Sequence, residues 1–278
     1  MTVVTSGILV LSCLLIGTKE GSGHLFEPIC GYSRSVFGYE GSQVSGVQSA
    51  HILSHPWMVM IIGSETCGGS LINSQFVLTS ADCLSDGHMK VRLGEFETTN
   101  SRDDCSSGSC IPTAYEIDVD KKIRHRDFDG SKNDIGLLRL AKTVQYSEYV
   151  MPICLLVNEQ VEYIRLFKAT SWGHTEHGRL GSSLQVATIE NINRRDCNWS
   201  LNSTHAVSQI CARGLHRVEC AGNPGGPLSA ERYYEGVLRV FQFGVIRNAP
   251  SPCTGLRVHT NVTHFTTWIS QVVNTFKY

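Results

Sequence analysis

Eleven cysteines lie in a chain of 278 residues, and an odd count in an exported protein leaves either a spare thiol or a cysteine that is removed. Residues 7–16 read GILVLSCLLI and contain one of the eleven, Cys13. This apolar stretch is too short for a membrane span, which needs about 20 residues, and it fits a secretory signal better than a buried strand. A cut after Gly23 would leave ten cysteines, and an even number in an exported chain predicts a disulfide framework.

The composition is that of a globular, nearly neutral chain. Hydrophobic residues make up 41% of it, and 24 Lys and Arg stand against 25 Asp and Glu, a net charge of −1. This balance excludes a general nucleic-acid binder, because such domains carry a basic excess. No other segment approaches a membrane span. We therefore predict a signal peptide (1–23), a Gly/Ser-rich leader that contains Cys30 (24–43) and one folded domain (44–278).

Short apolar runs between turn residues indicate an all-β body. The runs are Trp57–Gly63, Phe76–Ser80, Met89–Gly94, Ile135–Leu140, Phe167–Trp172 and Val240–Ile246. The last segment differs, because its apolar residues recur at helical spacing. These residues are Phe265, Trp268, Ile269, Val272, Val273 and Phe276. The sequence therefore predicts antiparallel β structure that ends in an amphipathic helix over Thr263–Tyr278.

Three segments match the acceptor pattern for N-linked glycans. They are Asn198-Trp-Ser, Asn202-Ser-Thr and Asn261-Val-Thr. The first two lie in a polar stretch and are the better candidates, whereas Asn261 is close to the start of the predicted helix. We expect the exported protein to be a glycoprotein.

Several segments in order together resemble the trypsin/chymotrypsin-like serine proteases of the insect type. They are Val44–Ala50 with Pro56-Trp57-Met58, Cys67–Ile72, Val77–Cys83, Asn133–Leu138 and Cys220–Leu228. The resemblance covers residues 44–278 and implies two packed six-stranded antiparallel Greek-key β-barrels with a C-terminal α-helix. It also implies a pairing of the ten cysteines, which spacing alone does not decide. The implied pairs are Cys30–Cys154, Cys67–Cys83, Cys105–Cys110, Cys197–Cys211 and Cys220–Cys253.

The resemblance places Asp82, Asp134 and Pro224 at the three positions of the catalytic triad. In that triad a serine attacks the peptide carbonyl, a histidine moves its proton and a buried aspartate orients the histidine. A carboxylate with a reference pKa of about 4 is a poor base for an alcohol. Proline has neither a nucleophile nor a backbone N–H for the oxyanion hole. With Gly222 and Asn223 as the rest of the oxyanion region, we expect no catalytic residue here and interpret Asp134 as a buried structural remnant.

Other positions also differ from active members of that family. Asn223 stands where an aspartate would pair with the new N-terminal amine after activation. Gln43 precedes Val44, where a trypsin-like activator would need Arg or Lys. The positions that correspond to the substrate pocket are Val218, Arg247, Asn248, Ala249 and Arg257. Of these, Arg257 replaces a small residue, and we expect its side chain to fill the pocket.

Other chemistries have weaker support in the sequence. The histidines are scattered, no zinc pattern is present, and His125 is expected at a solvated strand end. Asp82 and Asp134 could share a proton or a cation. An acidic group flanks the Cys105–Cys110 loop, where some relatives hold calcium, but a solvated acidic loop is the favoured interpretation. That group is Glu95, Asp103 and Asp104. We expect no metal and no cofactor.

These observations predict a secreted protease homologue that is not an enzyme. It would bind or regulate a protease, a protease precursor or an inhibitor in an extracellular proteolytic cascade. The predicted partner is therefore an extracellular protein, with no nucleic acid and no membrane span. Two alternatives stay open, an active serine endopeptidase and a module that binds carbohydrate or another surface.

Overall fold

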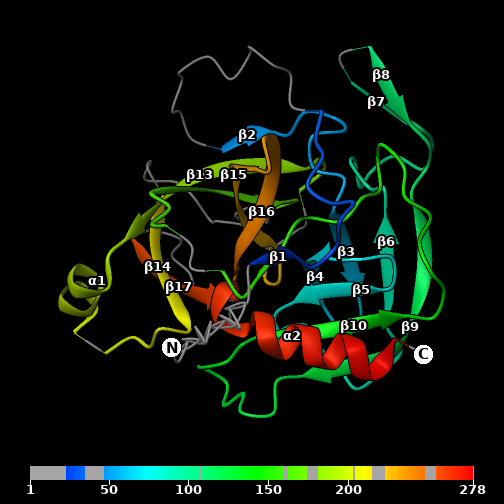
Figure 1. Ribbon diagram of the computed structural model, residues 1–278. Helices are drawn as coiled ribbons and strands as arrows, with labels where there is room; N and C mark the ends of the chain where they lie inside the picture. The colour runs from blue at the N-terminus through cyan, green and yellow to red at the C-terminus, as the bar shows by residue number, and fades with distance from the viewer. Residues whose placement is uncertain are drawn as a thin grey trace, which may run out of the picture.

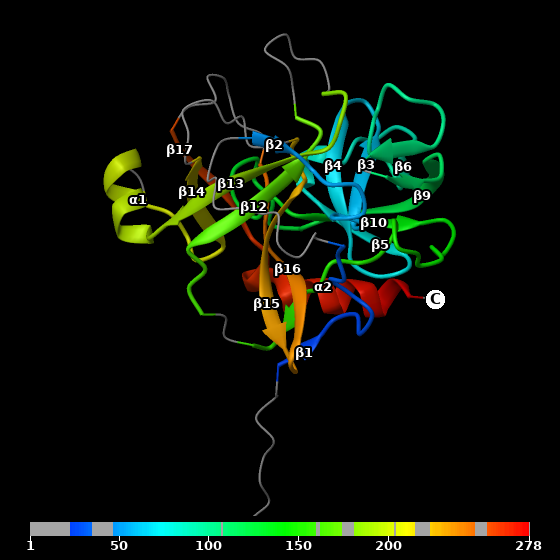
Figure 2. The ribbon, with the colours of Figure 1, turned by 90° about the horizontal axis from the view of Figure 1, so that it is seen from above.

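The computed structural model describes residues 23–34, 47–106, 108–159, 162–173, 181–202, 204–214, 223–247 and 255–277. Most of these residues form antiparallel strands, arranged as two barrels side by side with a helix at the C-terminus (Figures 1 and 2). The two barrels and the helix confirm the predicted fold class. No helix in the described ranges is long and apolar enough to cross a membrane.

The first barrel is a closed six-stranded sheet in the order β10-β5-β4-β3-β6-β9. Its strands are β3 (Met58–Ile62), β4 (Thr66–Leu71), β5 (Phe76–Thr79), β6 (Lys90–Leu93), β9 (Tyr115–Arg124) and β10 (Gly136–Leu140). Buried aliphatic side chains such as Leu71, Val77 and Leu138 fill it. Closure leaves no unpaired strand edge, which makes this barrel a rigid support for the loops at its rim.

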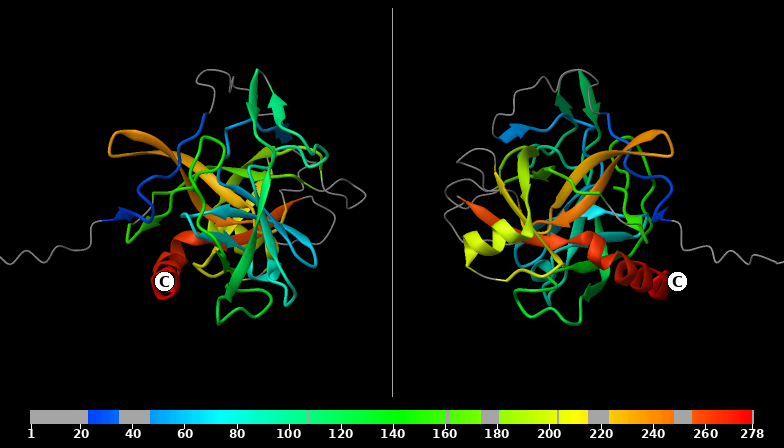
Figure 3. Two further views of the ribbon diagram at one scale, coloured as in Figure 1. Left: turned by 90° about the vertical axis from the view of Figure 1, so that its right-hand side faces the viewer. Right: turned by 60° about the vertical axis from the view of Figure 1, so that its left-hand side comes forward.

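The second barrel has the order β12-β15-β16-β17-β14-β13 and is closed by pairing of β12 with β13, while β2 adds a strand to β13. The bounds are β2 (Val47–Ser49), β12 (Leu166–Ser171), β13 (Gln185–Ile192), β14 (Gln209–Gly214), β15 (Pro227–Tyr234), β16 (Val237–Val245) and β17 (Leu256–Asn261). β15 and β16 form a long hairpin that projects from the body (Figure 3). Its turn is Glu235-Gly236, both at positive φ, as a tight hairpin turn requires.

The C-terminal helix α2 (Val262–Phe276) joins the two barrels. Phe265, Ile269 and Val273 on its buried face belong to one hydrophobic cluster with Trp57 of the first barrel and Val245 of the second. The side chain of Asn261 caps the helix by accepting a hydrogen bond from the backbone N–H of Thr263. The prediction from helical spacing was therefore correct within two residues at each end.

Smaller elements lie around the barrels. They are β1 (His24–Leu25), η1 (Ala81–Cys83), β7 (Asp104–Ser106), β8 (Ser109–Ile111), β11 (Leu156–Val157) and α1 (Arg194–Leu201). β7 and β8 form a small projecting hairpin, and α1 lies at the edge of the second barrel (Figures 1 and 3).

The first described segment, residues 23–34, is attached to the body of the fold. β1 pairs with β11, and Cys30 forms a disulfide with Cys154. Arg239 of β16 donates hydrogen bonds to the carbonyls of Pro28 and Cys30, and its guanidinium lies over the ring of Tyr32. Residues 24–34 are therefore bound by main-chain, side-chain and covalent contacts.

Candidate functional site

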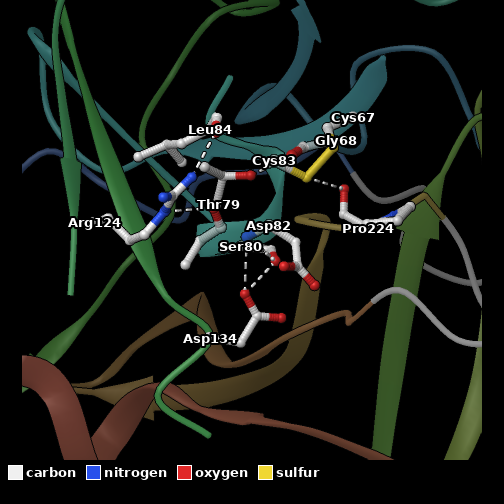
Figure 4. Close-up of a disulfide and its surroundings, with 11 residues drawn as sticks. Cys67, Gly68, Thr79, Ser80, Asp82, Cys83, Leu84, Arg124, Asp134 and Pro224 are labelled. Atoms are coloured by element: carbon white, nitrogen blue, oxygen red, sulfur yellow. Dashed lines mark hydrogen bonds between the residues drawn. A yellow bond between two sulfur atoms is a disulfide. The ribbon is translucent and has the colours of Figure 1, made fainter. Parts of the chain in front are cut away.

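Asp134 is the centre of the candidate site, and its side chain is fully buried. The carboxylate accepts hydrogen bonds from Ser80 Oγ at 2.5 Å and from the backbone N–H of Asp82 at 3.1 Å. Figure 4 shows both groups directed at Asp134. The main-chain carbonyl of Asp134 accepts a further bond from the Thr260 hydroxyl at 2.7 Å. A buried carboxylate needs such partners, because an unsatisfied charge in the interior is costly.

Arg247 supplies the counter-charge of this carboxylate. It follows β16, and its Nε lies 3.2 Å from Asp134 Oδ2. Only 16% of the Arg247 side chain is exposed, so the pair is largely removed from water. The sequence assigned Arg247 to the substrate pocket and gave no sign of this pairing. The sequence contained one indirect signal. Asp134 was expected to be buried without the histidine that normally pairs with it, and a buried carboxylate of this kind needs another cation nearby.

Asp82 lies on the exposed side of the site, in the short 3-10 helix η1. Ser80 caps this helix, and Arg124 fixes it by donating to the carbonyls of Ala81 and Leu84 at 3.2 and 2.7 Å. Partial burial and then the neighbouring Asp134 charge raise the pKa of the Asp82 carboxyl, while Arg247 and Arg124 oppose that rise. The structure thus brings Asp82 and Asp134 together, with a guanidinium near both charges.

Pro224 faces the same region from the second barrel. Its carbonyl accepts a hydrogen bond from the backbone N–H of Gly68 at 2.8 Å. The Sγ of Cys83, which Figure 4 joins to the same carbonyl, lies 3.5 Å away and has no proton to donate, because it is disulfide-bonded to Cys67. The next N–H, that of Gly225, already donates to the carbonyl of Ile246 at 2.8 Å.

Gly225 shows how tightly this segment packs on the first barrel. Its φ is +86°, and a Cβ at this position would lie 2.1 Å from Thr79 Oγ1 and 2.2 Å from the Gly68 carbonyl. Only glycine fits such a close backbone approach. Asn223, two residues before Gly225, is also buried. Within the described ranges, neither the oxygen nor the nitrogen of its side-chain amide has a hydrogen-bond partner.

β17, whose Thr260 donates to the Asp134 carbonyl, carries two further basic residues. Burial lowers the pKa of the half-buried Arg257. His259 is almost fully buried, and its pKa falls to about 3 through burial and then through the charges of Arg257 and Arg247. Sequence analysis missed His259, because nothing in the pattern distinguishes it from an exposed strand residue. The other predicted pocket and oxyanion residues, Val218, Gly222, Asn248 and Ala249, lie outside the described residues.

Four disulfides are present in the described part of the chain. They are Cys30–Cys154, Cys67–Cys83, Cys105–Cys110 and Cys197–Cys211. These are four of the five pairs that the resemblance implies, and the fifth, Cys220–Cys253, lies outside the described residues. Cys67–Cys83 joins β4 to η1 and so holds Asp82 against the barrel.

We predicted that the three acidic residues beside the Cys105–Cys110 loop are solvated, and this prediction was wrong for two of them. Asp104 is 5% exposed and accepts hydrogen bonds from the backbone N–H groups of Phe96 and Glu97. Glu95 is 8% exposed and pairs with Arg92 at 3.2 Å. Both carboxylates satisfy neighbouring donors, which is why they are buried. Within the ranges that the structure covers, no group of three His, Cys, Asp or Glu residues could hold a metal ion.

Comparison with known proteins gives the family. The trypsin family model matches residues 44–269. The chain belongs to the trypsin family. It is 32% identical to melanization protease 1 of Drosophila melanogaster over 84% of this chain and 66% of that protein. It is 31% identical to the CLIP domain-containing serine protease HP8 of Bombyx mori, over 87% and 71%.

A solved structure agrees with this assignment. The Drosophila Grass clip serine protease of the Toll pathway superposes with a TM-score of 0.73 at 26% identity, covering 88% of this chain and 75% of that one. Both relatives are named proteases, and HP8 is named a serine protease, so the chain belongs to a family of enzymes. The prediction that the protein is not an enzyme is therefore wrong. The assignment of Asp82 and Pro224 to the triad positions stays a prediction.

Proposed function

We propose that this chain acts in an extracellular proteolytic cascade by binding a protease, a protease precursor or a protease inhibitor. One observation carries the proposal: the Asp134 carboxylate is occupied by Ser80, by the Asp82 N–H and by Arg247. An aspartate with these partners holds η1 and the end of β16 in place around the candidate site. The similar solved structure is that of a protease of the Toll pathway, which supports a cascade as the setting.

The binding surface in this proposal is the region around Asp82 and Pro224. Asp82 sits in η1, which the Cys67–Cys83 disulfide holds to β4, and Pro224 precedes β15 and is held to β4 by the Gly68–Pro224 hydrogen bond. A surface fixed before a partner arrives loses little conformational freedom on binding, which favours affinity. The exposed Asp82 carboxylate gives this surface a negative group that a basic side chain of a partner could pair with.

A direct binding measurement tests the proposal. The full chain, secreted from insect cells and immobilised, is exposed to melanization protease 1 in its precursor and active forms and to a Kunitz-type inhibitor. We expect saturable binding of at least one of the three. Asp82→Arg should weaken it at least tenfold, a loss of about 1.4 kcal/mol. Glu235→Arg, which reverses a charge at the tip of the β15–β16 hairpin, is the matched control and should leave binding unchanged.

A second measurement addresses the family's own reaction. A fluorophosphonate probe labels the nucleophilic serine of an active serine protease. Covalent labelling at a serine, together with peptide hydrolysis and no binding in the first experiment, would overturn the proposed role and favour an endopeptidase.

A further inference from the structure

Trp199 is a large apolar residue whose side chain is not packed into the core. It belongs to α1, a helix at the edge of the second barrel (Figures 1 and 2), and 86% of its surface is exposed. By contrast, Trp57 and Trp172 are each 1% exposed. Only Cys197 of α1 is buried, through its disulfide to Cys211, so the helix is attached to the body mainly by that bond. The exposed face of this indole is available to a ligand that can cover it.

The three glycan acceptor segments differ in what their asparagine side chains do. The Oδ1 of Asn198 accepts hydrogen bonds from the backbone N–H and from the ring Nδ1 of His205, both at 2.9 Å. Asn261 caps α2 and also donates from Nδ2 to the carbonyl of Val207 at 2.9 Å. The hydroxyl of Thr263, part of the Asn261 segment, is bonded to Asn261 Oδ1 at 2.7 Å. A sugar on either asparagine would have to be accommodated within these contacts.

Asn202 is placed differently, at the exposed end of α1. It is the C-cap of the helix in the left-handed conformation, with φ 46° and ψ 43°, and its backbone N–H closes the last turn onto the carbonyls of Asn198 and Trp199. Thr204, the third residue of its acceptor segment, is also exposed. Asn202 follows Trp199 by three residues, and its backbone N–H lies 3.4 Å from the carbonyl oxygen of Trp199, so the two residues are neighbours at the end of the helix.

We propose that Asn202 carries an N-linked glycan and that its first N-acetylglucosamine covers the indole of Trp199. The C–H groups on one face of a sugar ring carry slight positive charge, and the face of an indole is negative, so the two surfaces attract each other. The proposal requires passage through the secretory route, which the binding function above also requires. It does not otherwise depend on that function.

The modification is a group transfer with a lipid diphosphate oligosaccharide as donor. A bond forms between Asn202 Nδ2 and C1 of the first sugar, and the bond between that C1 and the diphosphate oxygen breaks. The amide nitrogen loses one proton, and the lipid diphosphate leaves. The remaining amide N–H and the carbonyl stay available for hydrogen bonds.

Intact mass of the secreted chain tests the site. Asn202→Gln and Thr204→Ala should each lower the mass by one complete glycan, because both destroy the acceptor pattern. Thr204→Ser keeps the pattern and should keep the glycan. Asn198→Gln removes the neighbouring acceptor and should leave the mass of attached sugar unchanged. Full glycan mass in Asn202→Gln and Thr204→Ala overturns the assignment.

Quenching of tryptophan fluorescence by acrylamide tests the contact. A sugar on one face of the indole removes roughly half of the accessible ring, so Thr204→Ala should raise the quenching constant of the exposed tryptophan about twofold over the glycosylated chain. The same comparison in a Trp199→Phe background should show no difference, because Trp57 and Trp172 are buried and the partly buried Trp268 lies on another helix, α2. Equal quenching of the glycosylated and unglycosylated chains that keep Trp199 would overturn the proposed contact, even if Asn202 carries the glycan.

Discussion

The pairing of Asp134 with Arg247 gives a quantitative prediction for stability. Asp134→Asn keeps the volume and removes the charge, so the Arg247 guanidinium, with 16% of its side chain exposed, loses the carboxylate that it contacts. Removing one partner of a buried ion pair costs about 3–5 kcal/mol, and the residual exposure of Arg247 favours the lower end, about 3 kcal/mol. Arg247→Met should cost a similar amount, because it leaves a fully buried carboxylate unpaired.

The double variant separates this pair from simple packing loss. If the two charges support each other, Asp134→Asn with Arg247→Met should cost about 3–4 kcal/mol in place of the roughly 6 kcal/mol of two independent losses. The coupling energy would then be about 2–3 kcal/mol. The assay is unfolding in guanidinium chloride with the disulfides intact, with the thermal midpoint as a second measure. Each single variant should lower that midpoint by about 6–12 °C.

Additive losses would refute this reasoning, because they would mean that the 3.2 Å contact contributes nothing beyond the packing of each side chain. A loss below about 1 kcal/mol in Asp134→Asn would refute it as well, since that is the range of exposed ion pairs. Either result would remove the main support for a site whose structure depends on this ion pair.

Three other changes test neighbouring parts of the site. Asp82→Asn should stabilise the chain at pH 7, because the pKa of Asp82 is raised in the folded state, and the gain should vanish as the pH falls through that raised pKa toward 3.8. His259→Leu should reduce the loss of stability on acidification between pH 6.5 and about 3. In this range His259 is protonated in the unfolded chain but stays neutral in the folded chain. Gly225→Ala should abolish folding or cost at least about 3 kcal/mol, whereas Gly236→Ala, also at positive φ but with nothing within 4 Å of a Cβ, should cost only about 1 kcal/mol.

Each of the three has a result that contradicts it. The first two are tested by the free energy of unfolding in urea, measured as a function of pH. A pH-independent effect of Asp82→Asn, or an unchanged loss of stability with falling pH in His259→Leu, would show that these groups titrate normally. Equal stability of the two glycine variants would show that the close approach of Gly225 to Thr79 relaxes without cost.

The arrangement of strands was predictable because it depends on local patterns. The apolar run Trp57–Gly63 contains β3, and the helical spacing after residue 262 marks α2, because burial of one face repeats along the chain. α1 escaped prediction, since only Cys197 of its residues is buried and no apolar face exists to detect. The helix is set by its cap Asn193 and by a disulfide, neither of which produces a periodic signal.

The site was predictable only in part, for a related reason. The segments that resemble the family predicted that Asp82, Asp134 and Pro224 lie in one region, and the structure places them there. The partner of Asp134 lies 113 residues away in sequence, and no local pattern indicates which cation will meet a buried carboxylate. Glu95 and Asp104 were misjudged because burial of an acid depends on nearby N–H groups and on Arg92, which composition does not show.

The attachment of residues 24–34 has a consequence for any processing of this chain. Cleavage after Gln43 would produce two polypeptides, yet the shorter one would remain linked through Cys30–Cys154. Because β1 also pairs with β11 and Arg239 binds two carbonyls of the segment, reduction alone would leave several contacts to be broken. Electrophoresis without reductant would therefore show one band for both the intact and the cut protein. Maturation of this molecule would become visible only after the disulfide is reduced under denaturing conditions.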